Sequence, residues 1–139
     1  MPEALTLVFA GPKGRATTLR NIVKEAGWQL QSASDWRRAL DLAEHAHASV
    51  FVYDRDANPE EWAEALREVL DAGGESGEGP AFLMTSRLAD ESMWAELLIR
   101  RGYDLLMTPF DRVAVLRAIE SAHLRHAEAG TIIRRTAQT

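Results

Sequence analysis

The segment from Leu7 to Leu19, LVFAGPKGRATTL, leads from an apolar run through two glycines and a proline into a helical pattern. Backbone N–H groups at the start of a helix attract anions, and Lys13 and Arg15 would add positive charge. The segment matches neither GxxxxGK followed by Ser or Thr nor GxGxxG, and Pro12 removes one donor. A small anion- or nucleotide-binding domain that uses the Gly11–Gly14 turn is therefore one alternative, beside an ordinary turn that opens a helix.

Further polar side chains follow three other apolar runs, at Asp54, Asp56, Thr85 and Thr108. Carboxylates are the ligands that a hard ion such as Mg²⁺ favours. These residues can act together only if the fold brings the ends of the apolar runs to one place.

The elements that would position these residues alternate along the chain. Five β-type runs occupy residues 5–10, 28–33, 49–53, 81–84 and 104–107. Helical patterns lie between and after them. The first covers about residues 15–26, the second runs from a cap at Ser34 or Asp35 to about 45, and the fourth covers about 90–101. The third helix has Asn58 as its cap and Pro59 at its first position, and the fifth begins after Asp111. The pattern predicts a three-layer (βα)₅ doubly wound parallel sheet, whose functional crevice lies at the carboxyl ends of the strands.

Composition limits the function. The 139 residues are 46% hydrophobic and 27% charged, which is typical of one globular domain. A net charge of -5 argues against direct binding of nucleic acid, and the absence of cysteine excludes thiolate catalysis and cysteine-based zinc sites. No apolar run approaches the roughly 20 residues of a membrane span, so a cytoplasmic protein without a membrane partner is expected. The sequence contains no Ser-His-Asp or paired-acid arrangement, so we do not expect an enzyme.

Three stretches resemble the receiver domain of bacterial response regulators. KEAGWQLQSASDWRRALDLAEHAHASVFVYD is similar to the family's first helix through third strand, and it ends on the phosphoacceptor position, Asp54. FLMTS resembles the end of the fourth strand, with Thr85 at the Thr/Ser position, and YDLLMTPF is similar to the family's YLTKPF, with Pro109 after a peptide bond that is usually cis. The resemblance covers about residues 5–127 and implies a flavodoxin/CheY-like fold with strand order 2-1-3-4-5.

The same resemblance implies a pocket with much of its chemistry missing. The family's two metal-binding acids fall at Ala10 and Gly11, and its phosphoryl-binding Lys falls at Thr108. Asp56 stands where the family usually supplies only a backbone carbonyl. We therefore expect no resident metal, with Mg²⁺ binding weak or absent, and no other cofactor.

Two functions follow from the resemblance. The first is a degenerate receiver, or pseudo-receiver, in two-component-type signal transduction that acts mainly as a phosphorylation-independent protein–protein interaction module. The alternative is a true phosphoacceptor that a histidine kinase modifies at Asp54 and that signals through Thr85.

The family commonly uses its fourth helix, fifth strand and fifth helix to contact partners or to form dimers. The resemblance places an interaction face, and with it a homodimer contact, on Trp94, Arg100, Arg101, Asp104, Arg112, Arg117 and Glu120. Its partners would be proteins, either a histidine kinase or an output protein. We expect a receiver-like domain over residues 1–127, and a tail or linker over residues 128–139.

Overall fold

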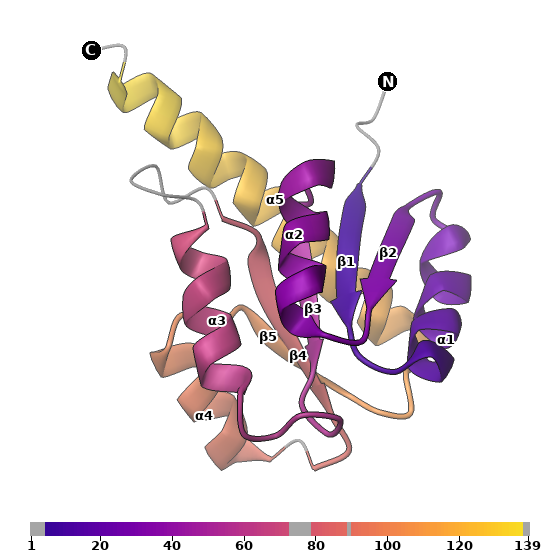
Figure 1. Ribbon diagram of the computed structural model, residues 1–139. Coiled ribbons are helices and arrows are strands. Elements are labelled where there is room, and N and C mark those ends of the chain that lie inside the picture. Colours follow the sequence, from indigo (N-terminus) through magenta and orange to yellow (C-terminus); the bar gives the residue numbers. More distant parts are fainter. Residues whose placement is uncertain (1–4, 73–78, 89, 138–139) are drawn as a thin grey trace.

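The computed structural model describes residues 5–72, 79–88 and 90–137. Five parallel strands form one sheet in the order β2-β1-β3-β4-β5, with helices on both faces (Figure 1). The strands are β1 (Thr6–Ala10), β2 (Gln29–Ala33), β3 (Val50–Asp54), β4 (Ala81–Ser86) and β5 (Asp104–Met107). The helices are α1 (Lys13–Lys24), α2 (Trp36–Ala46), α3 (Trp62–Asp71), α4 (Glu91–Ile99) and α5 (Arg112–Ala137). The predicted fold class and strand order are confirmed.

The core lies in two layers, one on each face of the sheet. Successive side chains of a strand point to opposite faces, so Val50 and Val52 of β3 pack with α1 and α5, whereas Phe51 and Tyr53 pack with α2, α3 and α4. Figure 1 shows α2 in front of the sheet and α5 behind it. Every residue of β3 is buried, which explains its continuous apolar sequence and leaves Asp54 as a charged residue at the end of a covered strand.

The start of α3 differs from the prediction. Asn58 does not cap this helix, which begins at Trp62 instead. The Asn58 amide donates a hydrogen bond to the Glu61 carboxylate (3.0 Å), and the Asn58 carbonyl accepts one from the Tyr53 hydroxyl (2.6 Å). Asn58 is therefore held in the loop that precedes α3, and Pro59 lies in that loop rather than in the first turn of the helix.

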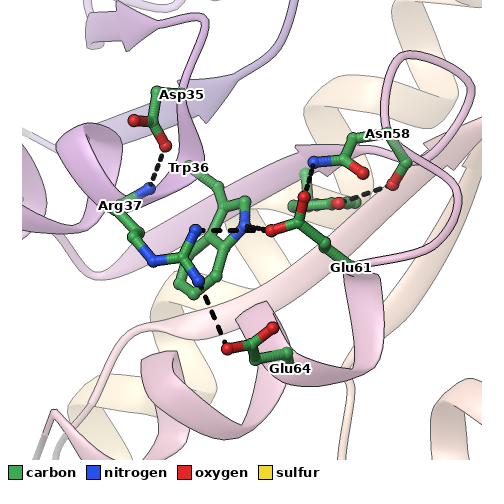
Figure 2. Close-up of polar contacts among 7 residues, drawn as sticks. Asp35, Trp36, Arg37, Asn58, Glu61 and Glu64 are labelled. Atoms are coloured by element: carbon green, nitrogen blue, oxygen red, sulfur yellow. Dashed lines mark hydrogen bonds and ion pairs between the residues drawn. The ribbon is translucent and has the colours of Figure 1, made fainter.

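A polar cluster joins the beginnings of α2 and α3 (Figure 2). Asp35 caps α2 by accepting a hydrogen bond from the Arg37 amide, and the Trp36 indole N–H donates to Glu61 (3.0 Å). The Arg37 guanidinium lies 4.3 Å from the centre of the Trp36 ring and contacts Glu61 and Glu64, each at 3.3 Å. The hydrogen bonds from Asn58 and then Trp36 lower the pKa of Glu61.

The backbone of α5 continues to Ala137, so the segment predicted as a tail or linker (128–139) is helical over residues 128–137. Helix five therefore does not end near residue 127, as the sequence suggested, because Gly130 does not interrupt it. In Figure 1 this end of α5 extends past the sheet. Among the described residues, none of the helices combines the length and the apolar character that a membrane crossing needs.

Candidate functional site

The carboxyl edge of the sheet brings together the residues that follow four of its strands. Asp54 ends β3 and lies in register with Thr85 of β4. Two backbone hydrogen bonds join the residues that follow β3 and β5 to the end of β4, from the Arg55 amide to the Thr85 carbonyl (2.9 Å) and from the Thr108 amide to the Ser86 carbonyl (3.2 Å). The strand ends thus meet at one edge, as a doubly wound sheet requires.

Asp54 lies at the centre of this edge and is 1% exposed. Arg15 donates a hydrogen bond from Nη1 to Asp54 Oδ2 and forms an ion pair with it, and the Thr85 hydroxyl donates to Oδ1 at 3.2 Å. Both carboxylate oxygens therefore have a donor. An ionised carboxylate buried without partners would be strongly unfavourable, and the guanidinium supplies the compensating charge.

Arg15 reaches Asp54 from the first turn of α1. The helix begins at Lys13, directly after the Gly11-Pro12 turn that follows β1, and β1 is the neighbour of β3 in the sheet. The Arg15 side chain is 32% exposed, so its guanidinium borders solvent on one side and Asp54 on the other. The sequence alone indicates for Arg15 only a place beside a possible phosphate cradle and does not reveal this contact.

A signal for the contact is present in the sequence. An acidic residue that ends a buried strand needs a cation, and the position after β5 holds Thr108 rather than a basic residue. Lys13 and Arg15 are the basic residues on the turn and helix that follow the adjacent strand, so they were the candidates to supply this charge.

The positions of the family's metal-binding acids do not fit a metal here. Ala10 is buried in the core on the α2 side of the sheet. A Cβ atom on Gly11 would lie 2.7 Å from the Phe9 ring and 2.8 Å from Asp54 Cβ, so no acidic side chain fits beside Asp54 without a shift of its neighbours. The described residues contain no group of three His, Asp or Glu side chains that could hold a metal ion. The Arg15 guanidinium is already paired with the Asp54 carboxylate, which such an ion would have to bind.

Thr108 follows β5 and is joined to Pro109 by a cis peptide bond. Its residue surface is 8% exposed, and its hydroxyl has no hydrogen-bond partner among the described residues. A buried hydroxyl without a partner is destabilising, which makes it an unusual feature of this edge.

Asp56 does not complete an acidic pair with Asp54. Its carboxylate accepts hydrogen bonds from the Ser86 hydroxyl and the Arg87 amide, both at 2.8 Å, and forms an ion pair with the Arg87 side chain at 3.5 Å. Burial favours the neutral acid, but these hydrogen bonds and the charges of Arg15 and Arg87 outweigh it and lower the pKa of Asp56. Asp56 thus fastens the loop after β3 to the loop after β4.

The first two residues of the Gly11–Gly14 turn have no free N–H group for a phosphate. The Gly11 amide donates to the Ala33 carbonyl at 3.0 Å, and Pro12 has no N–H group. The turn leads from β1 into α1, and the Gly11 amide ties it to the end of β2. Gly11 and Pro12 therefore offer no backbone donor to a phosphate, although no side chain caps the first turn of α1.

Among known proteins, only solved structures show a similarity to this chain. No family model matches the sequence, and no curated protein matches it. Solved structures do match: the chemotaxis protein CheY4 of Vibrio cholerae has a TM-score of 0.73 and 18% identity, covering 86% of this chain and 98% of that one. A response regulator from Thermotoga maritima has a TM-score of 0.76 and 12% identity, covering 87% of this chain and 98% of that one. The receiver domain of a Francisella response regulator has a TM-score of 0.73 and 20% identity, covering 88% of this chain and 98% of that one. The chain has the receiver-domain fold.

Within the receiver fold, the predicted interaction face is distributed over more than one surface. Arg100 lies 5.6 Å from the centre of the Trp62 ring and contacts Glu96, so it turns toward α3. Arg112 forms an ion pair with Glu25, next to the end of α1. Asp104 is half-buried, and the remaining members of the set are exposed: Trp94, Arg101, Arg117 and Glu120.

Helices α4 and α5 and strand β5 also expose apolar side chains that were not predicted from the sequence. Ile99 at the end of α4 is 81% exposed, Met107 at the end of β5 is 61% exposed, and Val113 in the first turn of α5 is also exposed. The signal was available for Ile99, because it follows the buried Leu97 by two positions, which places the two side chains on different sides of a helix.

Proposed function

We propose that this receiver-fold domain is a phosphorylation-independent protein–protein interaction module in two-component-type signal transduction. The observation that carries the proposal is the ion pair between Arg15 and Asp54. In a phosphoaccepting domain a carboxylate oxygen must attack phosphorus while cations neutralise the oxygens of the transferred group. Here one oxygen of Asp54 accepts a hydrogen bond from the guanidinium and the other accepts one from Thr85, and both hydrogen bonds make the carboxylate a weaker nucleophile.

The charge balance supports the same conclusion. Ala10, Gly11 and Thr108 provide neither carboxylates for a divalent ion nor a lysine for the phosphoryl oxygens. Arg15 supplies one positive charge, which the ion pair with Asp54 already neutralises. The electrostatic stabilisation that contributes most to phosphoryl transfer is therefore weak at this edge.

A small phosphodonor tests this proposal directly. The chain is incubated with acetyl phosphate and Mg²⁺, and its intact mass is measured beside that of Asp54→Ala. We expect no gain of a phosphoryl group in either protein. A stoichiometric gain in the natural chain that Asp54→Ala abolishes would replace this proposal by the alternative, a phosphoacceptor modified at Asp54 by a histidine kinase. The hydrogen bond between Thr85 and Asp54 is the observation that favours that alternative.

For the contact with partners, we propose the surface formed by α4, β5 and the start of α5. Trp94, Ile99, Met107 and Val113 expose apolar area there, and Arg101, Arg117 and Glu120 add charges. Buried apolar area must provide most of the affinity, because exposed ion pairs contribute only about 0–1 kcal/mol each. A second copy of the chain is one partner that this surface would accept, and a cytoplasmic kinase or output protein is another.

Sedimentation analysis tests self-association through this surface. If the chain dimerises, Ile99→Asp should shift it to monomer. The matched control, Leu124→Asp, removes a side chain that is 54% exposed and lies about 16 Å further along α5 than Val113. An equal effect of both substitutions would contradict the assignment to α4 and β5.

A further inference from the structure

Two adjoining hollows open near the amino ends of β4 and β5, away from the edge that carries Asp54. The first, of about 450 Å³, lies where these strands begin and is bordered by α4 and α5. The second, also of about 450 Å³, lies along α3 beside the end of α4, and Figure 1 shows these two helices next to each other. Leu70 lines both hollows, and the consecutive residues Arg100 and Arg101 line one each. Together the hollows form one surface, the amino-edge groove.

Four arginines line the amino-edge groove: Arg67, Arg100, Arg101 and Arg125. Arg100 is paired with Glu96 at 3.7 Å. Glu64 is the one acidic residue in the described lining, and its carboxylate lies 3.3 Å from the Arg37 guanidinium. The other three arginines form no ion pair with a described residue. The lining thus carries unbalanced positive charge, although the whole chain has a net charge of -5.

The ends of the helices account for only part of this charge. The carbonyl end of a helix attracts cations, so Arg100 and Arg101 gain stability by following the last turn of α4. Arg125 lies in the interior of α5, and Arg67 lies before the last turn of α3. The helix ends therefore do not explain the positive charge of Arg67 and Arg125.

The backbone at Arg101 provides an independent observation. Two hydrogen bonds close α4, from the Arg101 amide to the Leu98 carbonyl (3.0 Å) and from the Gly102 amide to the Leu97 carbonyl (2.8 Å). Glycine is usual at the first of these two donor positions, because the backbone there is left-handed and a side chain is strained. Here the residue is Arg101, with a φ of 71°. The chain thus bears a conformational cost where a guanidinium lines the groove, and a binding role for that side chain would explain it.

Apolar and aromatic side chains share the lining with these cations. Leu70 and Tyr103 are half-buried, and Leu98 is 40% exposed. The Arg125 guanidinium lies 5.9 Å from the centre of the Tyr103 ring, so it rests against the wall of the groove. A ligand with both carboxylates and an apolar side chain would match this lining, whereas a simple ion would leave the leucines uncovered.

We propose that the amino-edge groove binds an acidic peptide segment of a partner protein. Its carboxylates pair with the three guanidiniums that have no ion pair, because a guanidinium presents a planar fork of donors that fits a carboxylate. An apolar side chain of the segment packs against Leu70 and Leu98. The proposal rests on the proposed function in that the domain binds proteins, but it assigns a second surface, which shares only Arg101 with the surface of α4, β5 and the start of α5.

The acetylated and amidated peptide DEDLLEDE is the probe, because it joins carboxylates to two leucines. In a titration of the full chain followed by amide NMR shifts, we expect saturable changes at Leu70, Leu98 and Tyr103, with a dissociation constant on the order of 100 μM. NQNLLQNQ has the leucines without the charge, and DEDSSEDE has the charge without the leucines. Both should bind at least about fivefold more weakly, and binding of DEDLLEDE should weaken as NaCl is raised.

Variants locate the site. Arg125→Gln should weaken binding of DEDLLEDE about fivefold, as expected for loss of an exposed charge contact. Arg117→Gln is the matched control, because Arg117 is an exposed arginine of the same helix that lines neither hollow. Arg101→Gly should weaken binding by a similar factor without lowering Tm, because glycine relieves the backbone strain. Binding that does not change in Arg101→Gly would contradict the role inferred for this side chain.

Three further results would overturn the proposal. They are no saturable shift at about 2 mM DEDLLEDE, equal binding of NQNLLQNQ or DEDSSEDE, and equal weakening by Arg117→Gln and Arg125→Gln. Tighter binding of a single-stranded oligothymidylate at the same residues would assign the groove to nucleic acid instead. The acetyl phosphate experiment reports on Asp54 at the opposite edge of the sheet, so this proposal and the proposed function can fail separately.

Discussion

Arg15, in the first turn of α1, donates a hydrogen bond to the carboxylate of Asp54 at the buried end of β3. The two residues are 39 positions apart in the chain. The positive charge beside Asp54 is thus part of the polypeptide rather than a bound ion. An arginine of the chain thus links the first turn of α1 to the end of β3 at this edge of the sheet.

Arg15→Gln should lower the free energy of unfolding by about 2 kcal/mol, because it leaves the buried Asp54 carboxylate without its counter-charge. The estimate is below that for a fully buried pair, since the Arg15 side chain is 32% exposed. Urea unfolding measures the change. Arg20→Gln is the control: Arg20 lies on the same helix, and its side chain makes an exposed hydrogen bond to Ser32 (3.2 Å). It should change the stability by less than about 0.5 kcal/mol.

The double variant Arg15→Gln/Asp54→Asn completes a thermodynamic cycle. If the ion pair causes the loss, the double variant should be more stable than the sum of the two single changes predicts, by about 1 kcal/mol or more. Simple additivity would show that Arg15 supports the fold by packing and not through Asp54.

Mg²⁺ should not stabilise the protein. A cation that bound the folded state would raise the free energy of unfolding by about 1.4 kcal/mol at ten times its dissociation constant. Thermal unfolding with about 10 mM MgCl₂ should match that in NaCl of equal ionic strength. A rise in Tm specific to Mg²⁺ that disappears in Asp54→Ala would contradict the conclusion that the residues around Asp54 do not fit the metal.

Lowering the pH should remove the contribution of Asp56 to the free energy of unfolding. Hydrogen bonds from Arg87 and Ser86 hold the pKa of this carboxyl below its ordinary value of 3.8, against the effect of burial. A lowered pKa in the folded state means that the stabilisation is present above about pH 4 and is lost as the pH falls through the folded-state value. Asp56→Asn should therefore cost about 1 kcal/mol at pH 7 and less at pH 3.

Urea unfolding of both proteins at the two pH values measures this difference. Glu68→Gln, an exposed change on α3, is the control and should have an effect of less than about 0.5 kcal/mol at pH 7. If Asp56→Asn lowers the free energy of unfolding equally at both pH values, the charge of Asp56 does not contribute to stability.

Trp36→Phe tests the polar cluster between α2 and α3. The substitution removes the indole N–H that donates to Glu61 and reduces the buried area, so we expect a loss of about 1–2 kcal/mol. Hydrogen exchange should become faster in the first turn of α3, because Glu61 immediately precedes it. Trp94→Phe, at a tryptophan that is 48% exposed on α4, should have little effect on either measurement.

The order of elements was predictable because apolar patterning reports burial directly. The fully buried β3 appears as a continuous apolar run, and the pairing of Asp54 with Thr85 follows from parallel strands that end at one edge. The start of α3 was not predictable, because Asn58 bonds to a side chain, Glu61, in place of the backbone N–H groups that a cap would satisfy. The end of α5 was not predictable because the last twelve residues, with Gly130 and several β-branched residues, have the composition of a tail, whereas the helix continues to Ala137.

The candidate site was only partly predictable. The small residues Ala10 and Gly11 beside Asp54 could be identified from the sequence, but the ion pair between Arg15 and Asp54 could not. An ion pair between residues so far apart in sequence depends on the rotamer of a long side chain, and no periodic pattern encodes it. The unpaired hydroxyl of Thr108 is likewise a property of the assembled edge.

The close approach of Gly11 to its neighbours has an evolutionary consequence. A Cβ atom at this position would meet both the Phe9 ring and Asp54 Cβ at less than 3 Å. A single mutation to aspartate would therefore destabilise the domain before it could contribute to metal binding, and the buried Phe9 would have to become smaller first. With Arg15 already paired to Asp54, a descendant of this chain would need several coordinated substitutions to acquire a magnesium site.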